Sequence, residues 1–319
     1  MAVNSERIRE SARAEHGHAG KRLDQVAALL FPEHSRARLQ KWIRSGELTV
    51  DGRQARATFR ISGGELLDLD ARIKLQATVE PQDIPLDIIH DDRDLIVLNK
   101  PAGLLVHPAA GNPDGTLQNA LLHFDPGLAA LPRSGIVHRL DKDTSGVMVV
   151  ARSLRAHTSL VGQLQTRTMS RKYRAVVNGE VTAGGTVDAP IGRHPGDRKK
   201  MAVVHSGKPA VSHYRVLTRY PGVTYIEVAL ESGRTHQIRV HMTHIGHALA
   251  GDPVYGRPLK KKRELPAGLV DVIRGFPRQA LHAHRLSLIH PGEMKKFCFK
   301  APLPDDFAGL LESLEGYRK

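Results

Sequence analysis

The sequence has 319 residues, which is enough to form a sizeable core and two domains. Its formal net charge of +14 at pH 7 favours a polyanionic partner, because a soluble chain tolerates such self-repulsion where an anionic partner uses the charge. Aromatic residues make up only 4% of the chain, which argues against an extended surface for base stacking. No apolar stretch approaches the roughly 20 residues that span a bilayer, so we expect a soluble, cytoplasmic protein.

The single cysteine, Cys298, cannot form an internal disulfide, which agrees with a reducing compartment. It stands in the apolar run Phe297-Cys298-Phe299, and the sequence predicts that it is a small core residue.

The first part of the chain contains two predicted helices. Residues 1–19 are polar without apolar periodicity and predict a flexible tail. Apolar residues at helical spacing predict a helix over 23–30, closed by Pro32, and a second helix over 36–44. Short strands are expected over 48–50 and 65–69, around an Asp-Gly turn.

The second predicted helix has a strongly basic face. Its cations Arg36, Arg38, Lys41 and Arg44 either form a solvated surface or bind phosphate. The order of the segments RLDQ, SRARLQKWIRSGELTVDG and GGELLDL resembles an S4 RNA-binding domain. This resemblance implies an RNA-binding domain over 20–75. The charged, Pro-marked composition of residues 76–85 predicts a linker, and we expect a catalytic domain over 86–319.

The remainder of the chain alternates strands and helices without a regular βαβ repeat, which predicts an α+β fold. Expected strands cover 86–90, 94–99, the apolar residues on both sides of the loop in 136–152, 171–177, 212–217, 225–230 and 279–289. Expected helices cover 116–124, about a dozen residues from Ser153, the segment after Gly233, and 308–314.

The stretch IVHRLDKDTSGVMVVAR, residues 136–152, contains the most informative loop. Asp141 lies between the cations Arg139 and Lys142, and such neighbours favour an ionised carboxylate that can act as nucleophile or base. One interpretation is a charged hairpin turn. A calcium loop fails, because its twelfth position would be Arg152. An aspartyl-phosphate loop with Asp141 as nucleophile and Asp143 as acid/base stays open, although that loop normally follows an uninterrupted strand near the N-terminus.

The motif HRLD followed by TSG and an apolar strand resembles the RluA/RluD-type pseudouridine synthases. The resemblance implies that Asp141 is the indispensable catalytic residue. The segment RKYRA implies that Tyr173 lies against the target uracil and is a candidate acceptor of its C5 proton. The segment SGRTHQIRVH implies an arginine that pairs with Asp141, which by position is Arg234.

The same resemblance implies a largely antiparallel mixed sheet flanked by helices. It implies as substrate 23S rRNA of the large ribosomal subunit or its precursor, at uridines in the loop of helix 69, and no cofactor or metal. Arg139 is expected to fill the space left by the extruded base. The basic loop over residues 193–200 is expected to bind phosphate through Arg193, His194, Lys199 and Lys200. We expect a monomer.

Three alternatives remain at this stage. The histidines His236, His241, His244 and His247 could form a zinc site, but no cysteine or carboxylate stands at ligand spacing. A magnesium-dependent phosphatase would use Asp141 and Asp143. A non-enzymatic RNA-binding or assembly factor would need only the S4-like domain and the basic loops.

Overall fold

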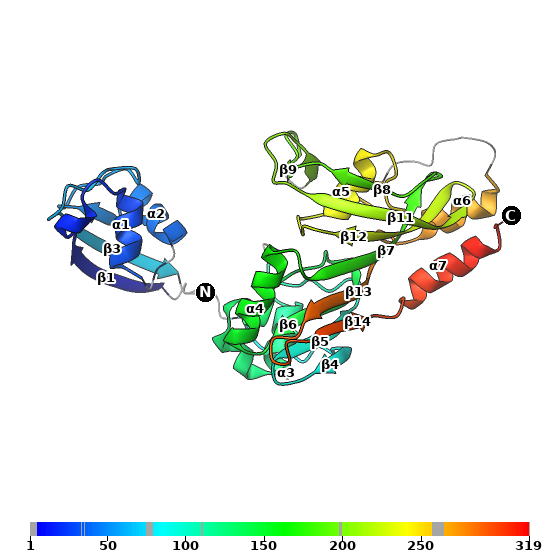
Figure 1. Ribbon diagram of the computed structural model, residues 1–319, viewed down its shortest axis with the longest axis horizontal. Coiled ribbons are helices and arrows are strands. Elements are labelled where there is room, and N and C mark those ends of the chain that lie inside the picture. Colours follow the sequence, from blue (N-terminus) through cyan, green and yellow to red (C-terminus); the bar gives the residue numbers. More distant parts are fainter. Residues whose placement is uncertain are drawn as a thin grey trace. The chain divides into compact units, whose positions relative to one another are not determined.

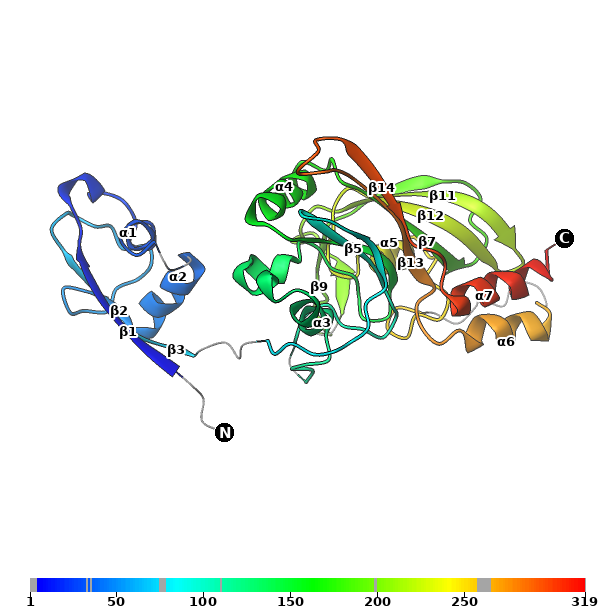
Figure 2. The same cartoon turned by 90° about the horizontal axis from the view of Figure 1, so that it is seen from below.

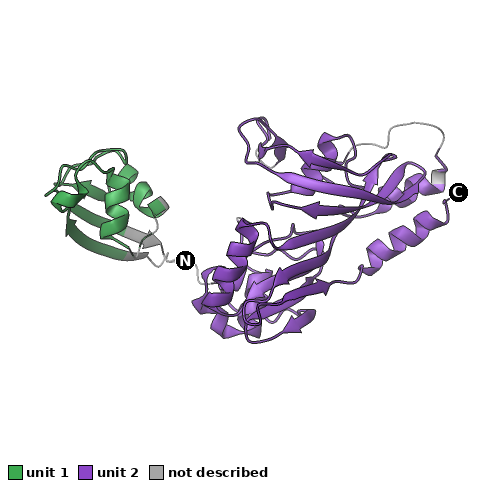
Figure 3. Cartoon of the chain, in the orientation of Figure 1, with its two compact units in different colours: residues 1–78 green, residues 79–319 purple. Residues whose placement is uncertain are grey.

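Separate hydrophobic cores divide the chain into two units, residues 1–78 and 79–319 (Figure 3). The computed structural model describes residues 5–32, 34, 36–74, 79–109, 111–197, 200–256 and 265–318.

Unit 1 is a three-stranded sheet packed against two helices. Its strands are β1 (Ser5–Arg13), β2 (Leu48–Val50) and β3 (Leu66–Lys74), in the antiparallel order β1-β3-β2. The 3-10 turn η1 (His16–His18), α1 (Leu23–Leu30) and α2 (Arg36–Ser45) complete it. The two predicted helices and the short strand over 48–50 are therefore confirmed.

A buried carboxylate joins the two helices of unit 1. Asp24 of α1 accepts hydrogen bonds from Arg36 and Gln40 of α2, at 2.7 and 2.6 Å. Burial raises the pKa of Asp24, but these hydrogen bonds and the charge of Arg22 outweigh it and lower the pKa to about 2. Arg36 thus has a structural role in addition to the phosphate binding predicted for it.

The predicted flexible tail is wrong over Ser5–Arg13, which forms β1. This strand pairs antiparallel with β3, from Ser5 opposite Lys74 to Arg13 opposite Leu66. Only Ile8 and Ala12 are partly buried hydrophobic residues of β1 in contact with the core. The apolar signal is therefore too sparse to predict a strand, which forms because β3 offers it a complete hydrogen-bonding edge.

Part of the predicted linker packs on unit 2. The backbone carbonyl of Glu80 accepts a hydrogen bond from Asn119, and Gln82 accepts one from the backbone N–H of Gly115. Residues 76–78 lie outside the described residues.

Unit 2 is built on a nine-stranded sheet (Figures 1 and 2). The strands pair in the order β4-β5-β6-β13-β7-β12-β11-β8, with β14 paired to β13. The pairing of β13 with β6 is parallel and the other pairings are antiparallel, which confirms the predicted α+β class with a mixed, largely antiparallel sheet. The strands are β4 (Ile88–Asp91), β5 (Leu95–Lys100), β6 (Ser145–Ala151), β7 (Ser170–Asn178), β8 (Gly185–Asp188), β11 (Val211–Tyr220), β12 (Val223–Leu230), β13 (Leu281–Ile289) and β14 (Lys296–Lys300).

Helices and a small hairpin surround this sheet. The hairpin consists of β9 (Ile191–Arg193) and β10 (Met201–Val203). The helices are α3 (Leu117–Phe124), η2 (Pro126–Ala130), η3 (Pro132–Gly135), α4 (Leu154–Gln165), α5 (Gln237–His244), α6 (Ala267–Gly275) and α7 (Asp305–Glu315). Helices α6 and α7 lie side by side and share a core that includes Leu269, Ile273 and Phe307 (Figure 2). The structure contains no helix, among the described residues, with the length and apolar character needed to cross a membrane.

Two predictions for unit 2 are wrong. The apolar residues before the loop that contains Asp141 form no strand. Ile136 makes only an isolated bridge to Val150. Cys298 is exposed, since β14 alternates its faces and buries the flanking Phe299 instead.

The glycine of the TSG motif sets the contact between β6 and β13. Gly146 has φ 120°, and a β-carbon there would come within 2.2 Å of the carbonyl oxygen of Ala283. Only glycine allows the two strands to approach this closely. The loop that precedes Gly146 is thereby fixed to the centre of the sheet.

Candidate active site

A cavity of about 620 Å³ opens beside the loop over 137–144. Its walls come from that loop, from β7, and from the segment that leads from β12 into α5. Asp141 and Tyr173 both line it, so the fold brings together the two distant motifs that contain these residues.

Asp141 is held by an arginine of α5. Oδ2 of Asp141 accepts a hydrogen bond from Nη1 of Arg239 at 3.1 Å. The same guanidinium donates from Nε and Nη2 to both oxygens of the buried Asp252, at 2.7 and 2.9 Å. Burial lowers the pKa of Arg239, but the bonds and charge of Asp252 together with Asp141 raise it more strongly, so the net shift is upward. Asp252 therefore fixes the orientation in which Arg239 meets Asp141.

His236 approaches Asp141 from the other side. Its Nε2 lies 3.9 Å from Oδ1 of Asp141. The hydroxyl of Tyr255 accepts from the backbone N–H of Met201 and lies 2.8 Å from Nδ1 of His236, so its own hydrogen is available to that nitrogen. This arrangement places the imidazole proton on Nε2, facing Asp141. Burial lowers the pKa of His236, which favours this neutral form.

Three side chains from two other segments fix the loop around Asp141. The ammonium of Lys100 donates to the carbonyl of Lys142 at 2.9 Å, and also to the carbonyls of Pro101 and Leu104. Arg278 donates to the carbonyl of Asp143, and the side-chain amide of Gln279 donates to the buried Thr144. Burial lowers the pKa of Lys100 to about 7. We assign the protonated form, because the three carbonyls can accept all three ammonium hydrogens.

Two residues of β7 project into the cavity from one face of the strand. Tyr173 is 6% exposed and Arg171 is 8% exposed. Burial raises the pKa of Tyr173, and the charge of Arg171 partly opposes this. Tyr173 is therefore a neutral phenol at neutral pH and needs a relay to accept a proton.

The predicted partner of Asp141 is wrong. Arg234 lines the cavity, but its Nε donates to the carbonyl of Pro209 at 3.1 Å, and the charged partner of Asp141 is Arg239. Helix α5 begins at Gln237, after His236 in a left-handed conformation with φ 57°. Because of this, Arg239 lies on the buried side of α5 while Arg234 precedes the helix and is exposed.

The predicted RNA contacts lie on several surfaces. Arg139 is exposed at the cavity and lines it. Arg36, Arg38, Lys41 and Arg44 are exposed on α2 of unit 1. Arg193 and His194 are exposed at the β9–β10 hairpin, where Lys200 is half-buried. These hairpin residues do not line the cavity, and Lys199 lies outside the described residues.

The histidines of the zinc alternative do not converge. His241 bonds to Ser212 and to the carbonyl of Ala189, and His247 bonds to the carbonyl of Asn178. Within the described ranges, the one group of potential ligands that comes together is His90, Asp92 and His290.

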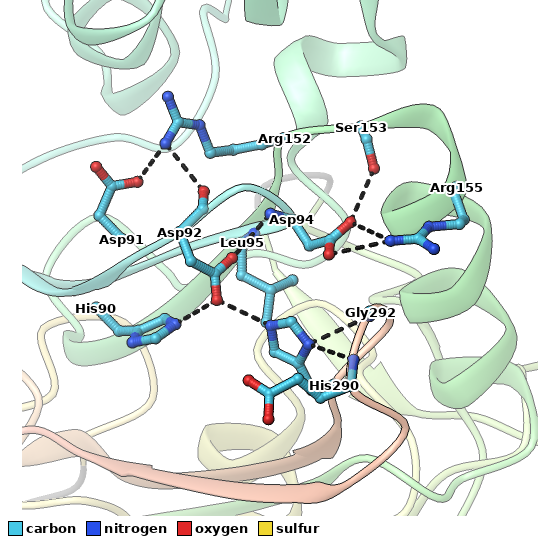
Figure 4. Close-up of polar contacts among 11 residues, drawn as sticks. His90, Asp91, Asp92, Asp94, Leu95, Arg152, Ser153, Arg155, His290 and Gly292 are labelled. Carbon is cyan, nitrogen blue, oxygen red and sulfur yellow. Dashed lines mark hydrogen bonds and ion pairs between the residues drawn. The ribbon is translucent and has the colours of Figure 1, made fainter.

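That group is a hydrogen-bonded junction rather than a metal site (Figure 4). Oδ2 of Asp92 lies 2.6 Å from Nε2 of His90 and 2.9 Å from Nε2 of His290. Nδ1 of His290 accepts two backbone N–H bonds, from Gly292 and Glu293. The proton of His290 must then lie on Nε2, and a protonated nitrogen cannot bind a metal. The junction instead joins the turn after β4 to the turn after β13.

Comparisons with known proteins agree with this geometry. A family profile described as RNA pseudouridylate synthase matches residues 94–244, and one described as S4 domain matches residues 21–67. Ribosomal large subunit pseudouridine synthase D of Pseudomonas aeruginosa is 54% identical over 99% of this chain and 98% of its own. The protein of the same description from Escherichia coli strain K12 is 48% identical over 97% of this chain and 95% of its own.

Solved structures are similar over a large share of the chain. The structure titled human RNA pseudouridylate synthase domain containing 4 has a TM-score of 0.55 at 26% identity, over 72% of this chain and 93% of its own. The structure titled human RNA pseudouridylate synthase domain containing 1 has a TM-score of 0.54 at the same identity, over 72% of this chain and 89% of its own. Because full-length relatives are about half identical, this chain belongs to the RluA/RluD-type RNA pseudouridine synthases, with an S4 domain ahead of the catalytic unit.

Proposed function

We propose that this enzyme converts uridines of 23S rRNA in the large ribosomal subunit to pseudouridine, at the loop of helix 69, with Asp141 as the catalytic carboxylate. The names of the relatives, which describe enzymes of the ribosomal large subunit, support the RNA class. The observation that carries the catalytic assignment is the position of Asp141, at the cavity wall and bonded to the buried Arg239.

The reaction needs few groups. The N1–C1′ bond breaks and leaves its electron pair on the uracil ring. The ring turns, a pair from C5 forms the new bond to C1′, the C5 proton leaves, and N1 takes up a proton, so that atoms and charge balance. No net oxidation, hydrolysis or phosphoryl transfer occurs, so the proposal includes neither a cofactor nor a metal.

The side chains at the cavity divide these tasks. Asp141 engages the ribose, either as nucleophile at C1′ or by removing a sugar proton. Arg239 orients the carboxylate, and Asp252 orients Arg239. Tyr173, buried in the wall, is the candidate to receive the C5 proton through a relay. Arg139, exposed at the opening, is placed to occupy the space that the extruded base leaves.

We propose further that the enzyme acts in the cytoplasm on the precursor of the large subunit, as a monomer. The S4 domain contributes phosphate contacts that do not depend on sequence. Extruding a base is least costly in a loop, where stacking and pairing are already incomplete, which supports a loop target.

The phosphatase alternative has less support in the geometry. It requires Asp143 beside Asp141 at the reacting group. Asp143 does not line the cavity, and its backbone carbonyl is bound by Arg278.

The test uses the full chain and a 23S rRNA fragment that contains helix 69. Pseudouridine is mapped by reverse-transcription stops after carbodiimide treatment, with and without excess chelator. The proposal expects modification of loop uridines that is unchanged by chelator. Modification confined to another helix would overturn the target. Activity lost in chelator and restored by magnesium or zinc would overturn the metal-free mechanism. Tight RNA binding without any modification would favour an assembly factor.

A further inference from the structure

One buried arginine in the cavity wall, Arg171, has no carboxylate partner among the described residues. Arg171 is 8% exposed and makes no ion pair with any described carboxylate. Its Nε is buried and has no hydrogen-bond acceptor in the described part of the chain, and its Nη2 is 3.5 Å from the carbonyl of Glu231, at the limit of a hydrogen bond. Burying a guanidinium costs free energy, which hydrogen bonds to an acceptor would offset.

The neighbouring cations of β7, unlike Arg171, do have a carboxylate partner. Lys172 and Arg174 point to the opposite face of the strand, and both pair with Glu227, at 3.3 and 3.5 Å. Arg171 shares its face with Tyr173, as the two-residue period of a strand requires. The strand therefore places one cation without a carboxylate partner beside Tyr173 in the cavity wall.

The adjoining backbone leaves room for the guanidinium. A β-carbon at position 233 would come within 2.6 Å of Nη1 of Arg171. Gly233 thus forms part of a cradle that a methyl group would fill. The glycine lets the guanidinium lie close to the backbone, and the Nε of Arg171 can donate to an acceptor that enters the cavity.

We propose that Arg171 donates hydrogen bonds to a carbonyl oxygen of the target uracil and stabilises the negative charge on the ring after the N1–C1′ bond breaks. This inference rests on the proposed function and adds a substrate-contacting residue to it. Uracil carries two carbonyl acceptors, O2 and O4, and the anion released from C1′ spreads charge onto both. Cytosine replaces O4 with an amino donor, so a contact at O4 would also select uridine.

Depth in the cavity distinguishes the base from the phosphate as the acceptor. Four other arginines of the cavity lining are exposed, where RNA phosphates can approach them: Arg133, Arg139, Arg167 and Arg234. Arg171 is instead buried in the wall next to Tyr173. The base is the part of an extruded nucleotide that enters most deeply, whereas its phosphates stay with the RNA strand at the opening.

The test measures kcat at saturating RNA, and separately the RNA affinity, for Arg171→Gln in the full chain. Loss of a donor to a developing anion lowers kcat by about a hundredfold or more, with little change in affinity. Lys172→Gln is the matched control, because it removes the same charge from the opposite face of β7 and should keep kcat. Reduced affinity with normal kcat would identify Arg171 as a phosphate contact and overturn the proposal.

Gly233→Ala moves the guanidinium without changing any charge, so it tests the proposal even if Arg171→Gln fails to fold. It should lower kcat while the melting temperature stays near wild type. Normal kcat in a folded Gly233→Ala protein would overturn the proposal.

Modified substrates identify the oxygen. RNA with 2-thiouridine or 4-thiouridine at the target position replaces one carbonyl oxygen with a poorer acceptor. One of the two should slow the wild type but add nothing to the defect of Arg171→Gln, because both changes remove the same bond. Additive defects for both would contradict the contact. If wild type itself makes no pseudouridine, the proposed function fails, which is a different outcome.

Discussion

Oδ2 of Asp141 lies 3.1 Å from Nη1 of Arg239, a residue 98 positions later in the chain. The two segments meet because the loop over 137–144, which carries Asp141, and α5, which carries Arg239, both border the same cavity. The pair is part of a chain of three charged groups that ends at the buried Asp252.

Arg239→Ala should reduce turnover by more than a hundredfold and affect RNA affinity much less. The substitution leaves Asp141 without the donor that orients it and leaves Asp252 buried without its partner. Breaking a buried ion pair in this way typically lowers the free energy of unfolding by about 3–5 kcal/mol. Arg239→Lys should restore turnover only partly, because an ammonium cannot reproduce the planar fork. Single-turnover rates and filter binding separate the two effects.

Arg234→Ala is the matched comparison from the same motif. Because Arg234 is exposed and bonds to the carbonyl of Pro209, its loss should weaken RNA binding more than turnover at saturating RNA. If Arg234→Ala lost turnover while Arg239→Ala kept it, the observed pairing would have no role in catalysis.

Asp252→Asn should lower turnover by about tenfold or more without removing any group from the cavity lining. The asparagine keeps one oxygen, which can still accept the backbone N–H bonds of Val254 and Tyr255, but its amino group faces a guanidinium N–H. Partial recovery in Asp252→Glu would indicate that orientation of Arg239 is the cause. Full activity of a folded Asp252→Asn protein would show that Arg239 needs no such support.

Removal of the exposed cations of α2 should flatten the salt dependence of RNA binding. Each phosphate contact contributes roughly 0.7–0.9 to the magnitude of the slope of log affinity against log salt. In a variant with Arg38, Lys41 and Arg44 changed to Gln, the magnitude of this slope should therefore fall by about 2. A variant with Lys295, Lys296 and Lys300 changed to Gln removes the same charge from the exposed β13–β14 hairpin. Equal slopes for the two variants would mean that α2 is only a solvated face.

Asp92→Asn should destabilise the catalytic unit in a pH-dependent way. Burial raises the pKa of Asp92, but hydrogen bonds from His90, from two backbone N–H groups and from His290 lower it to about 2, below the ordinary 3.8. The depressed pKa means that Asp92 contributes stability above about pH 4, roughly 2 kcal/mol, and that this contribution is lost as pH falls through 2.

Urea unfolding of wild type and Asp92→Asn across pH 3–7 measures this contribution. The gap in unfolding free energy should be constant from pH 7 to about 5 and narrow below pH 4. A gap that widens on acidification would contradict the assigned hydrogen bonds.

Local patterns were sufficient to predict much of the fold. The helical spacing over 23–30 and 36–44 and the apolar run of β6 each follow from side chains close in sequence, and the structure contains all three elements. Strand β1 could not be predicted, because its stability comes from β3, which lies more than fifty residues later. Cys298 was assigned to the core from its neighbours, whereas the face it occupies depends on how β14 registers with β13.

At the site, too, some residues could be predicted from local sequence and others could not. Asp141 and Tyr173 stand in recognisable motifs and do line the cavity. The choice between Arg234 and Arg239 depended on where α5 begins, and the left-handed backbone of His236 gives no clear signal in sequence. Arg171 stood among other cations in RKYRA, and only the pairing of its neighbours with Glu227 distinguishes it.

The central claim, that the carboxylate of Asp141 performs the isomerisation, is tested most directly by Asp141→Asn. The measurement is the amount of pseudouridine formed in the helix 69 fragment at saturating enzyme, with RNA affinity and melting temperature determined in parallel. The account predicts turnover below about a thousandth of wild type with RNA binding retained, because the amide can neither attack the sugar nor remove a proton from it. Turnover within tenfold of wild type in the folded variant would contradict it.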